Sequence, residues 1–151
     1  MVCSILDIDL DYFNLLSDPI VALHDLLTWA QRPVSVVVEH HSQVLHKWRH
    51  QLQARGLADP THILHVDEHH DMMDQKRYVN IANVMYHAMI VWPACRIHWL
   101  VEESVDWPDM WLDEKIWRYL RPRFSHGKAC PQRWPRPEIV SVCISPEFVT
   151  V

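Results

Sequence analysis

The sequence predicts an α/β protein, a three-layer, doubly wound parallel sheet of about five strands with helices on both faces. Three observations lead to this fold class. Apolar runs of strand length alternate along the chain with segments of helical spacing. The run 34–38 is apolar almost throughout, which is typical of a strand covered on both faces. Polar residues cluster where the strands end, and the carboxyl ends of parallel strands meet at one edge.

The elements follow one another without an internal repeat. The expected strands are 2–10, 34–38, 62–66, 96–101 and 139–144, and the expected helices are 19–31, 42–54, 78–91 and 108–120. Pro33 ends the first helix and Gly56 the second. A basic, proline-rich loop is expected over 121–137. With 151 residues, of which 49% are hydrophobic, the chain fits a single domain spanning 1–151.

Composition excludes several classes of protein. Two isolated glycines, Gly56 and Gly127, cannot form a phosphate-cradling loop, so nucleotide-dependent chemistry is not expected. A net charge of −5 does not suggest binding to nucleic acid or to an anionic membrane. The four cysteines form no CxxC pair and are interpreted as reduced thiols, and no apolar run reaches membrane-spanning length. We therefore expect a soluble, cytoplasmic protein.

The strongest motif follows the third expected strand, in the segment His65-Val66-Asp67-Glu68-His69-His70-Asp71. If extended geometry persists, alternation places His65, Asp67, His69 and Asp71 on one side. Two carboxylates and an imidazole would then converge. The alternative is a set of exposed turn residues, but acids and histidines buried beside an apolar strand would need a cation.

The first strand carries Asp7, Asp9 and Asp11 at alternate positions. No lysine or arginine occurs before Arg32, so a metal ion is the natural counter-charge if this face is buried. The alternative is an edge strand with one solvated face. The second strand ends in Glu39-His40-His41, where a histidine is more often structural. A ligand role there gains weight only because two other strands end in acids.

These residues resemble the metal-binding motifs of the arginase superfamily. Asp67-x-His69-x-Asp71, Asp7-x-Asp9 and His41-Ser42 look like its Asp-x-His-x-Asp, Asp-x-Asp and Asp-His-Ser motifs. The resemblance is closer to the small peptide arginases, which convert arginine residues of ribosomally synthesised peptides to ornithine. The similar patches are the Asp-Ile-Asp-Leu-Asp-Tyr-Phe start, the Val-Asp-Glu-His-His-Asp segment and the Ser-Pro-Glu-Phe end.

Two features depart from ordinary arginases. The Asp-x-Asp strand comes first rather than last, as in a permuted chain, and Val-Glu-His replaces Gly-Gly-Asp before His41, so His40 competes with His41 as ligand. If the permuted motifs keep their places, the resemblance implies a minimal arginase-like fold. Its strand order would be 34–38, 139–144, 2–9, 62–67, 96–101, with the Asp7 strand at the centre.

Carried over residue by residue, the resemblance implies two manganese ions. His41, Asp67, Asp71 and Asp7 would hold the first, and Asp67, His69, Asp7 and Asp9 the second. A water shared by the two ions would attack the guanidinium carbon, releasing urea and leaving ornithine. Asp71 would also orient that water.

Three further residues are candidates for contact with the substrate. Glu147, after the last strand, resembles the glutamate that binds the guanidinium in arginases; its alternative role is that of an exposed acid in a turn. Asn83 and His87 are four residues apart on an expected helix. Asn83 is a candidate for substrate binding and His87 for proton transfer, and core or capping roles are the alternative.

The resemblance implies a ribosomally synthesised precursor peptide as substrate. Seven of the 14 lysines and arginines lie between Lys115 and Arg136, among aromatic residues. This segment could bind an acidic leader peptide or a neighbouring subunit of a homo-oligomer, or it could be a solvated face. Two other functions stay open. One is a deacetylase-like amide hydrolase with a single zinc and a His40-His41 dyad, and the other is a non-catalytic metal-binding interaction protein.

Overall fold

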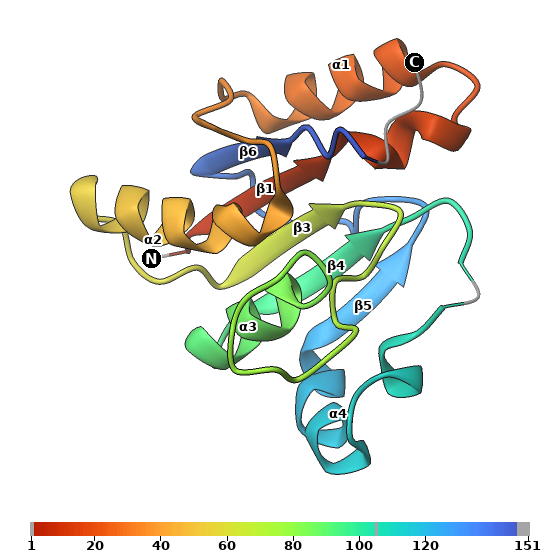
Figure 1. Ribbon diagram of the computed structural model, residues 1–151. Helices are drawn as coiled ribbons and strands as arrows, with labels where there is room; N and C mark the ends of the chain where they lie inside the picture. Colours follow the sequence, from red (N-terminus) through yellow and green to blue (C-terminus); the bar gives the residue numbers. More distant parts are fainter. Residues whose placement is uncertain (1, 105, 148–151) are drawn as a thin grey trace.

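In the computed structural model, which describes residues 2–104 and 106–147, the chain forms one parallel sheet of six strands (Figure 1). The strands are β1 (Ser4–Asp9), β2 (Val36–Val38), β3 (His62–Val66), β4 (Arg96–Leu100), β5 (Phe124–Gly127) and β6 (Ile139–Cys143). Their order is β2-β6-β1-β3-β4-β5, and every neighbouring pair is parallel. The predicted fold class and the predicted order of five strands are confirmed.

The sixth strand, β5, lies inside the segment that we expected to be a loop. Its sequence, Phe-Ser-His-Gly, has one apolar side chain and no hydrophobic alternation, so periodicity could not reveal it. It becomes a strand because it pairs with β4, from Phe124 opposite Ile97 to Gly127 opposite Leu100. Tertiary pairing, rather than local sequence preference, determines this element.

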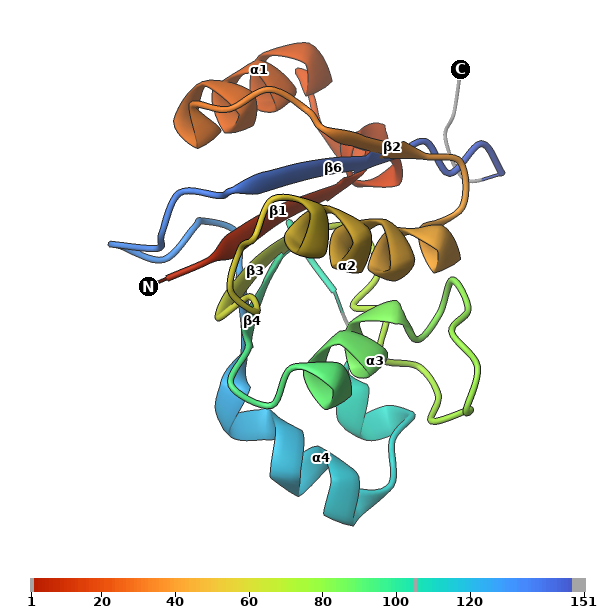
Figure 2. The same ribbon diagram turned by 90° about the vertical axis from the view of Figure 1, so that its left-hand side faces the viewer.

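Helices cover both faces of the sheet. They are α1 (Pro19–Ala30), α2 (Val44–Ala54), α3 (Val84–Val91) and α4 (Glu114–Leu120), with short 3-10 turns η1 (Leu10–Leu15), η2 (His41–Gln43), η3 (Pro108–Met110) and η4 (Arg121–Arg123). Figure 2 shows α1 on one side of the sheet and α2, α3 and α4 on the other. Alternation in β1 separates the two cores: Ile5 packs in the core with α2 and α3, and Leu6 in the core with α1.

Two predicted helices are shorter than expected. The helix expected over 78–91 begins only at Val84, because the side chains of Asp74, Asn80 and Asn83 bind backbone and one another in the preceding loop. The helix expected over 108–120 is divided into η3 and α4, and Asp113 caps the latter by accepting a hydrogen bond from the Lys115 backbone N–H. Polar side chains that bond to nearby backbone account for both differences.

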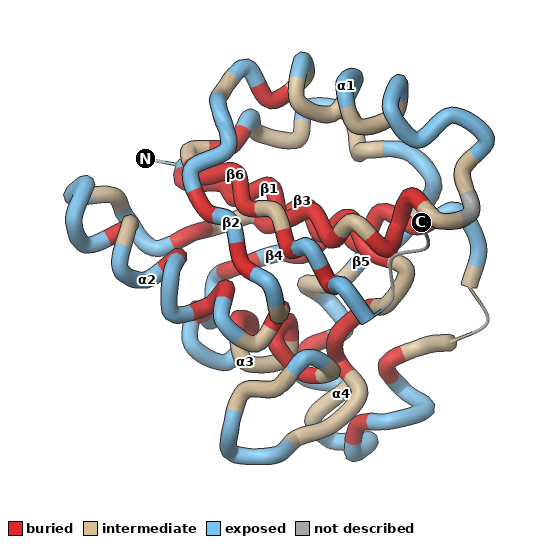
Figure 3. The backbone as a smooth tube through the Cα atoms, turned by 45° about the horizontal axis from the view of Figure 1, so that its top comes forward, coloured by how far each residue is buried: buried red, intermediate tan, exposed pale blue. Residues whose placement is uncertain are grey.

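The centre of the sheet is fully enclosed. All six residues of β1 are buried, including Asp7 and Asp9, so this strand is not an edge strand with a solvated face. Figure 3 shows the buried strands between helices whose outer surfaces are exposed. Among the residues that the structure describes, no helix is long and apolar enough to cross a membrane.

Candidate metal centre

Acidic and imidazole side chains meet where β1, β2 and β3 end. Parallel strands bring their carboxyl ends to one edge of the sheet. After β1 and β2 the chain leaves the sheet within a few residues and enters a 3-10 turn. Eight residues form the cluster: Asp7, Asp9, Asp11, His41, His65, Asp67, His69 and Asp71. All are buried except His69, whose side chain is 39% exposed. The fold thus brings together side chains from three separate parts of the sequence, 7–11, 41 and 65–71.

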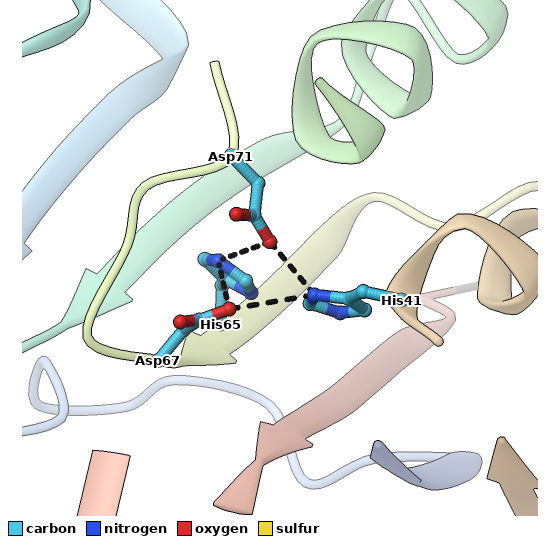
Figure 4. Close-up of side chains that lie close together, drawn as sticks. All are labelled: His41, His65, Asp67 and Asp71. Carbon is cyan, nitrogen blue, oxygen red and sulfur yellow. Dashed lines mark ion pairs between the residues drawn. The ribbon is translucent and has the colours of Figure 1, made fainter. Parts of the chain in front are cut away.

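Four of these residues place one ligand atom each within 4.8 Å of one another: His41, His65, Asp67 and Asp71. Figure 4 shows their side chains pointing toward a common point. His41 Nδ1 lies 2.7 Å from Asp71 Oδ2 and 3.4 Å from Asp67 Oδ2. Asp71 has a left-handed backbone (φ 57°), and its carbonyl accepts hydrogen bonds from the first turn of α3. The turn from β3 into α3 therefore aims the Asp71 carboxylate back at the strand ends.

A second group of three residues shares Asp67: Asp11, Asp67 and His69. His69 Nδ1 lies 3.1 Å from Asp11 Oδ2 and 3.4 Å from Asp67 Oδ1. The His69 backbone N–H also donates to Asp67 Oδ1, which fixes the turn. Asp67 thus directs Oδ1 toward one group and Oδ2 toward the other, which is the arrangement expected of a carboxylate that bridges two ions.

Asp7 lies beneath the two groups and does not line the cavity above them. It is opposite Ser141 and His65 in the strand register and is hydrogen-bonded to both, at 2.9 Å each. Its Oδ2 also lies 2.7 Å from His41 Nε2. Because a carboxylate accepts, Nε2 of His41 carries the proton, and the other ring nitrogen, Nδ1, faces the acids. A carboxylate behind a metal-binding histidine commonly fixes its ring in this way.

His65 is held from both sides. Its Nε2 lies 2.9 Å from the carbonyl of His69, and its Nδ1 faces Asp7. A carbonyl oxygen only accepts, so Nε2 carries a proton and the ring holds the 67–71 turn in place. Burial alone would lower the pKa of His65, but Asp7, Asp67 and Asp71 raise it to about 9. Burial lowers the pKa of His41 too, but Asp7 and Asp71 raise it well above the usual value, so charge does not distinguish the two rings. His65 is less suited than His41 to bind an ion because both of its ring nitrogens are engaged, by Asp7 and by the His69 carbonyl.

The cluster contains more acidic than basic groups. Its five carboxyl groups outnumber its three imidazoles. Burial and the charge of Asp67 raise the pKa of Asp9 to about 8 and that of Asp71 to about 7. Burial opposes ionisation of Asp67 as well, but the neighbouring imidazoles of His41, His69 and His65 hold its pKa well below the usual range. A cation between the groups would remove this conflict.

Two buried oxygen atoms support the same conclusion. Oδ2 of Asp67 and Oδ2 of Asp71 have no hydrogen-bond partner among the described residues. The 2.7 Å approach of His41 Nδ1 to Asp71 Oδ2 is a close contact that is not aligned as a hydrogen bond. Buried carboxylate oxygens are normally satisfied. Carboxylate oxygens together with one or two imidazoles per group suit a divalent cation.

A cavity of about 210 Å³ opens above the cluster. It is smaller than the ~300–1,000 Å³ of pockets for drug-sized ligands, and it suits a single side chain. Asp9, Asp11 and Asp71 line its floor, and His40 and Glu147 line its mouth. His40 Nδ1 and Glu147 Oε1 are 3.8 Å apart, and both side chains are about half exposed. Of the two competing histidines, His41 lies in the cluster and His40 at the mouth.

Two predicted site residues do not line this cavity. Asn83 is the N-cap of α3, and its amide donates to Asp74 and to the Tyr78 carbonyl. His87 Nε2 lies 2.9 Å from the Lys76 carbonyl. Both therefore hold the 74–83 loop, whose residues Ile81 and Ala82 form part of the cavity wall. The structure does not bring them into the carboxylate–imidazole cluster.

The predicted ligand sets did not include Asp11 or His65, although strand alternation placed both beside predicted ligands, and Ser145 entered only as part of the Ser-Pro-Glu-Phe motif. Strand alternation predicts the directions of Asp7 and Asp9 but not of Asp11, because the chain leaves the strand at Asp9 and enters η1. Ser145 Oγ donates to Asp9 Oδ2 at 2.7 Å from a left-handed backbone (φ 45°). Phe148, part of the motif that ends the chain, lies outside the described residues.

The fold and the cluster define an α/β protein with a buried carboxylate–imidazole site that could hold a metal ion, which is compatible with a metal-dependent hydrolase. Comparison with protein-family models, curated proteins and solved structures gives no match. The function is therefore argued from the site itself.

Proposed function

We propose that this protein is a manganese-dependent hydrolase that converts arginine residues of a peptide to ornithine and releases urea. The observation that carries the proposal is the position of Asp67, whose two oxygens face two separate ligand groups. A shared carboxylate of this kind favours two ions over the single zinc of a deacetylase-like hydrolase. The resemblance of the motifs to peptide arginases supplies the reaction class.

The proposed aspartate ligands from the first strand lie two residues further along the chain than those that the resemblance first suggested: Asp9 replaces Asp7, and Asp11 replaces Asp9. One ion would be held by His41, Asp67, Asp71 and Asp9, and the other by Asp67, His69, Asp11 and Asp9. Asp9 and Asp11 line the cavity, whereas Asp7 does not and is surrounded by His41, His65 and Ser141. Asp7 would act as the carboxylate that orients His41. When bound, two divalent ions supply Lewis-acid chemistry and lower the pKa of water.

The remaining residues bind and orient the substrate. The cavity admits one extended side chain, and Glu147, one of its lining residues, offers a carboxylate to the planar, permanently charged guanidinium. Asp71 lines the cavity, and its carboxylate would orient the attacking water. Water adds its oxygen to the guanidinium carbon, the bond from that carbon to the side-chain nitrogen breaks, and that nitrogen leaves as the protonated amine of ornithine.

The test combines metal analysis with a urea assay. Protein reconstituted with Mn²⁺ should bind two equivalents and release urea from an arginine-containing peptide faster than from free arginine. One tightly held zinc without a second metal would favour the deacetylase alternative. Two bound metals without urea from either substrate would indicate a non-catalytic metal-binding protein.

A further inference from the structure

Helix α2 presents a surface with positive but no negative charge. Its sequence, VLHKWRHQLQA, contains no aspartate or glutamate. His46, Lys47, Arg49 and His50 are exposed. Within the described part of the chain, none of these four side chains has a hydrogen bond or ion pair. By contrast, Arg55 beyond the end of the helix is paired with Glu138. The four exposed side chains are therefore available to an anionic partner.

A groove of about 490 Å³ runs along this helix. Its lining includes His46, Arg49 and His50 from α2, and Val79 from the loop before α3. Figure 2 shows this loop beside α2 and α3. The groove has apolar contacts at its base, from Leu45 and Val79, and nitrogen groups along its rim. Such a lining suits an extended polypeptide with acidic side chains.

The groove adjoins the candidate active site through two chain segments. Ser42 lines the groove and directly follows His41, which lines the cavity. Val79 lines the groove, and Ile81, two residues later in the same loop, lines the cavity. A polypeptide with one side chain in the cavity can therefore continue into the groove.

The opposite side of the molecule has the reverse charge. A second groove near the carboxyl end of β4 is lined by Asp18, Asp25, Glu102 and Glu103, with Lys128. An acidic stretch would be repelled there and attracted to α2. The two grooves therefore favour one orientation of the substrate peptide, with its acidic segment toward α2.

We propose that the α2 groove binds an acidic segment of the same peptide whose arginine enters the cavity; this inference rests on the proposed function. Eight residues of helix separate His41 from Arg49, roughly 12 Å at ~1.5 Å per residue. An extended peptide covers ~3.3 Å per residue, so the acidic residues lie about four positions from the arginine. The preferred substrate class is then a peptide with an arginine and a nearby acidic run.

The experiment compares three peptides that share one arginine in a neutral sequence. One has no acidic residue, and the others carry three glutamates beginning about four positions before or after the arginine. With the manganese-loaded protein, one acidic peptide should give a kcat/KM about tenfold higher than the neutral peptide, and the advantage should fall with salt.

Arg49→Glu should remove this advantage and leave the neutral peptide unchanged within about twofold. Arg121→Glu is the matched control, since Arg121 is equally exposed and the change in net charge is the same. If the acidic peptides have no advantage, or if both variants reduce it equally, the groove is not the binding site, although urea release from the neutral peptide still supports the proposed function.

Binding provides a readout that does not need turnover. A fluorescent acidic peptide with lysine in place of arginine should bind wild-type protein and Arg121→Glu alike, and Arg49→Glu about tenfold more weakly. Equal affinity for all three proteins would overturn the inference. Absence of urea from every peptide, together with selective loss of binding in Arg49→Glu, would refute the proposed reaction. The same result would still support the α2 groove as a binding site for acidic peptides.

Discussion

Two regions of this protein are dense in charge, and they differ in what the charged groups contact. In the segment 115–136, Arg123 donates through Nη1 to the carbonyls of Met89, Trp92 and Cys95, although its Nη2 has no hydrogen bond to a described residue, and Arg136 donates to the carbonyl of Trp29. In the metal cluster, by contrast, buried oxygens of Asp67 and Asp71 lack hydrogen bonds. Density of charge therefore does not by itself mark a site. Buried carboxylate oxygens that lack a hydrogen bond and lie within one ligand group are the stronger signal.

The largest expected effect is that of Asp67→Ala in the cluster. The variant loses the carboxylate that faces both ligand groups, so we expect no measurable urea release and the loss of at least one metal equivalent. Metal analysis measures the number of bound ions, and the urea assay measures turnover. Asp109→Ala, at an exposed acid in η3, is the control and should behave as wild type. Full metal content in Asp67→Ala would rule out a bridging role.

Glu147→Gln should have the next largest effect. The amide keeps the shape of the side chain but removes the charge that faces a guanidinium, so turnover should fall on the order of 10²-fold. Metal content should not change, because Glu147 lies at the mouth of the cavity. Glu103→Gln, an exposed acid that does not line this cavity, is the control. A variant as fast as wild type would show that the guanidinium is bound elsewhere.

The stability of the metal-free protein should fall as the pH rises from about 6 to about 8.5. Asp71 and Asp9 have pKa values raised to about 7 and about 8, chiefly by burial and by Asp67. Because the folded state then holds protons that the unfolded state releases near pH 4, each rise in pH through these values disfavours folding.

His65 acts in the same direction. Burial lowers its pKa, but the neighbouring acids raise it to about 9, so its stabilising contribution is complete below about pH 6.5 and is lost toward pH 9. Added Mn²⁺ should reverse the trend, since ligands bind in their deprotonated forms. Melting temperatures recorded between about pH 6 and pH 8.5, in EDTA and in Mn²⁺, measure the pH dependence of stability without and with metal. A melting temperature that rises with pH in EDTA would contradict the assignment.

The smallest effect is expected in the other charged region. Arg123→Ala removes a guanidinium that binds carbonyls at and after the C-terminal end of α3, so the free energy of unfolding should fall by about 1–3 kcal/mol. Metal content and urea release per folded molecule should not change. Arg121→Ala, two residues away and exposed, should change stability by less than about 0.5 kcal/mol. A loss of metal in Arg123→Ala would show that the two regions are coupled.

Hydrophobic periodicity made most of the fold predictable. Continuous apolar runs gave five parallel strands, and their order was anticipated through the resemblance of the motifs. The additional strand β5 and the late start of α3 were not predictable. Pairing with β4 creates β5, and bonds from Asp74 to Asn80 and Asn83 hold the loop before α3.

The sequence by itself determined which residue types would meet. Asp9, His41, Asp67, His69 and Asp71 follow strands whose carboxyl ends must share an edge, because parallel pairing brings those ends together. Only the tertiary structure decided the role of each atom. Asp7 faces inward because its strand neighbours, Ser141 and His65, and the His41 ring surround both of its oxygens. Asp11 reaches the cavity because the chain turns at Asp9, where strand alternation no longer sets the direction of a side chain.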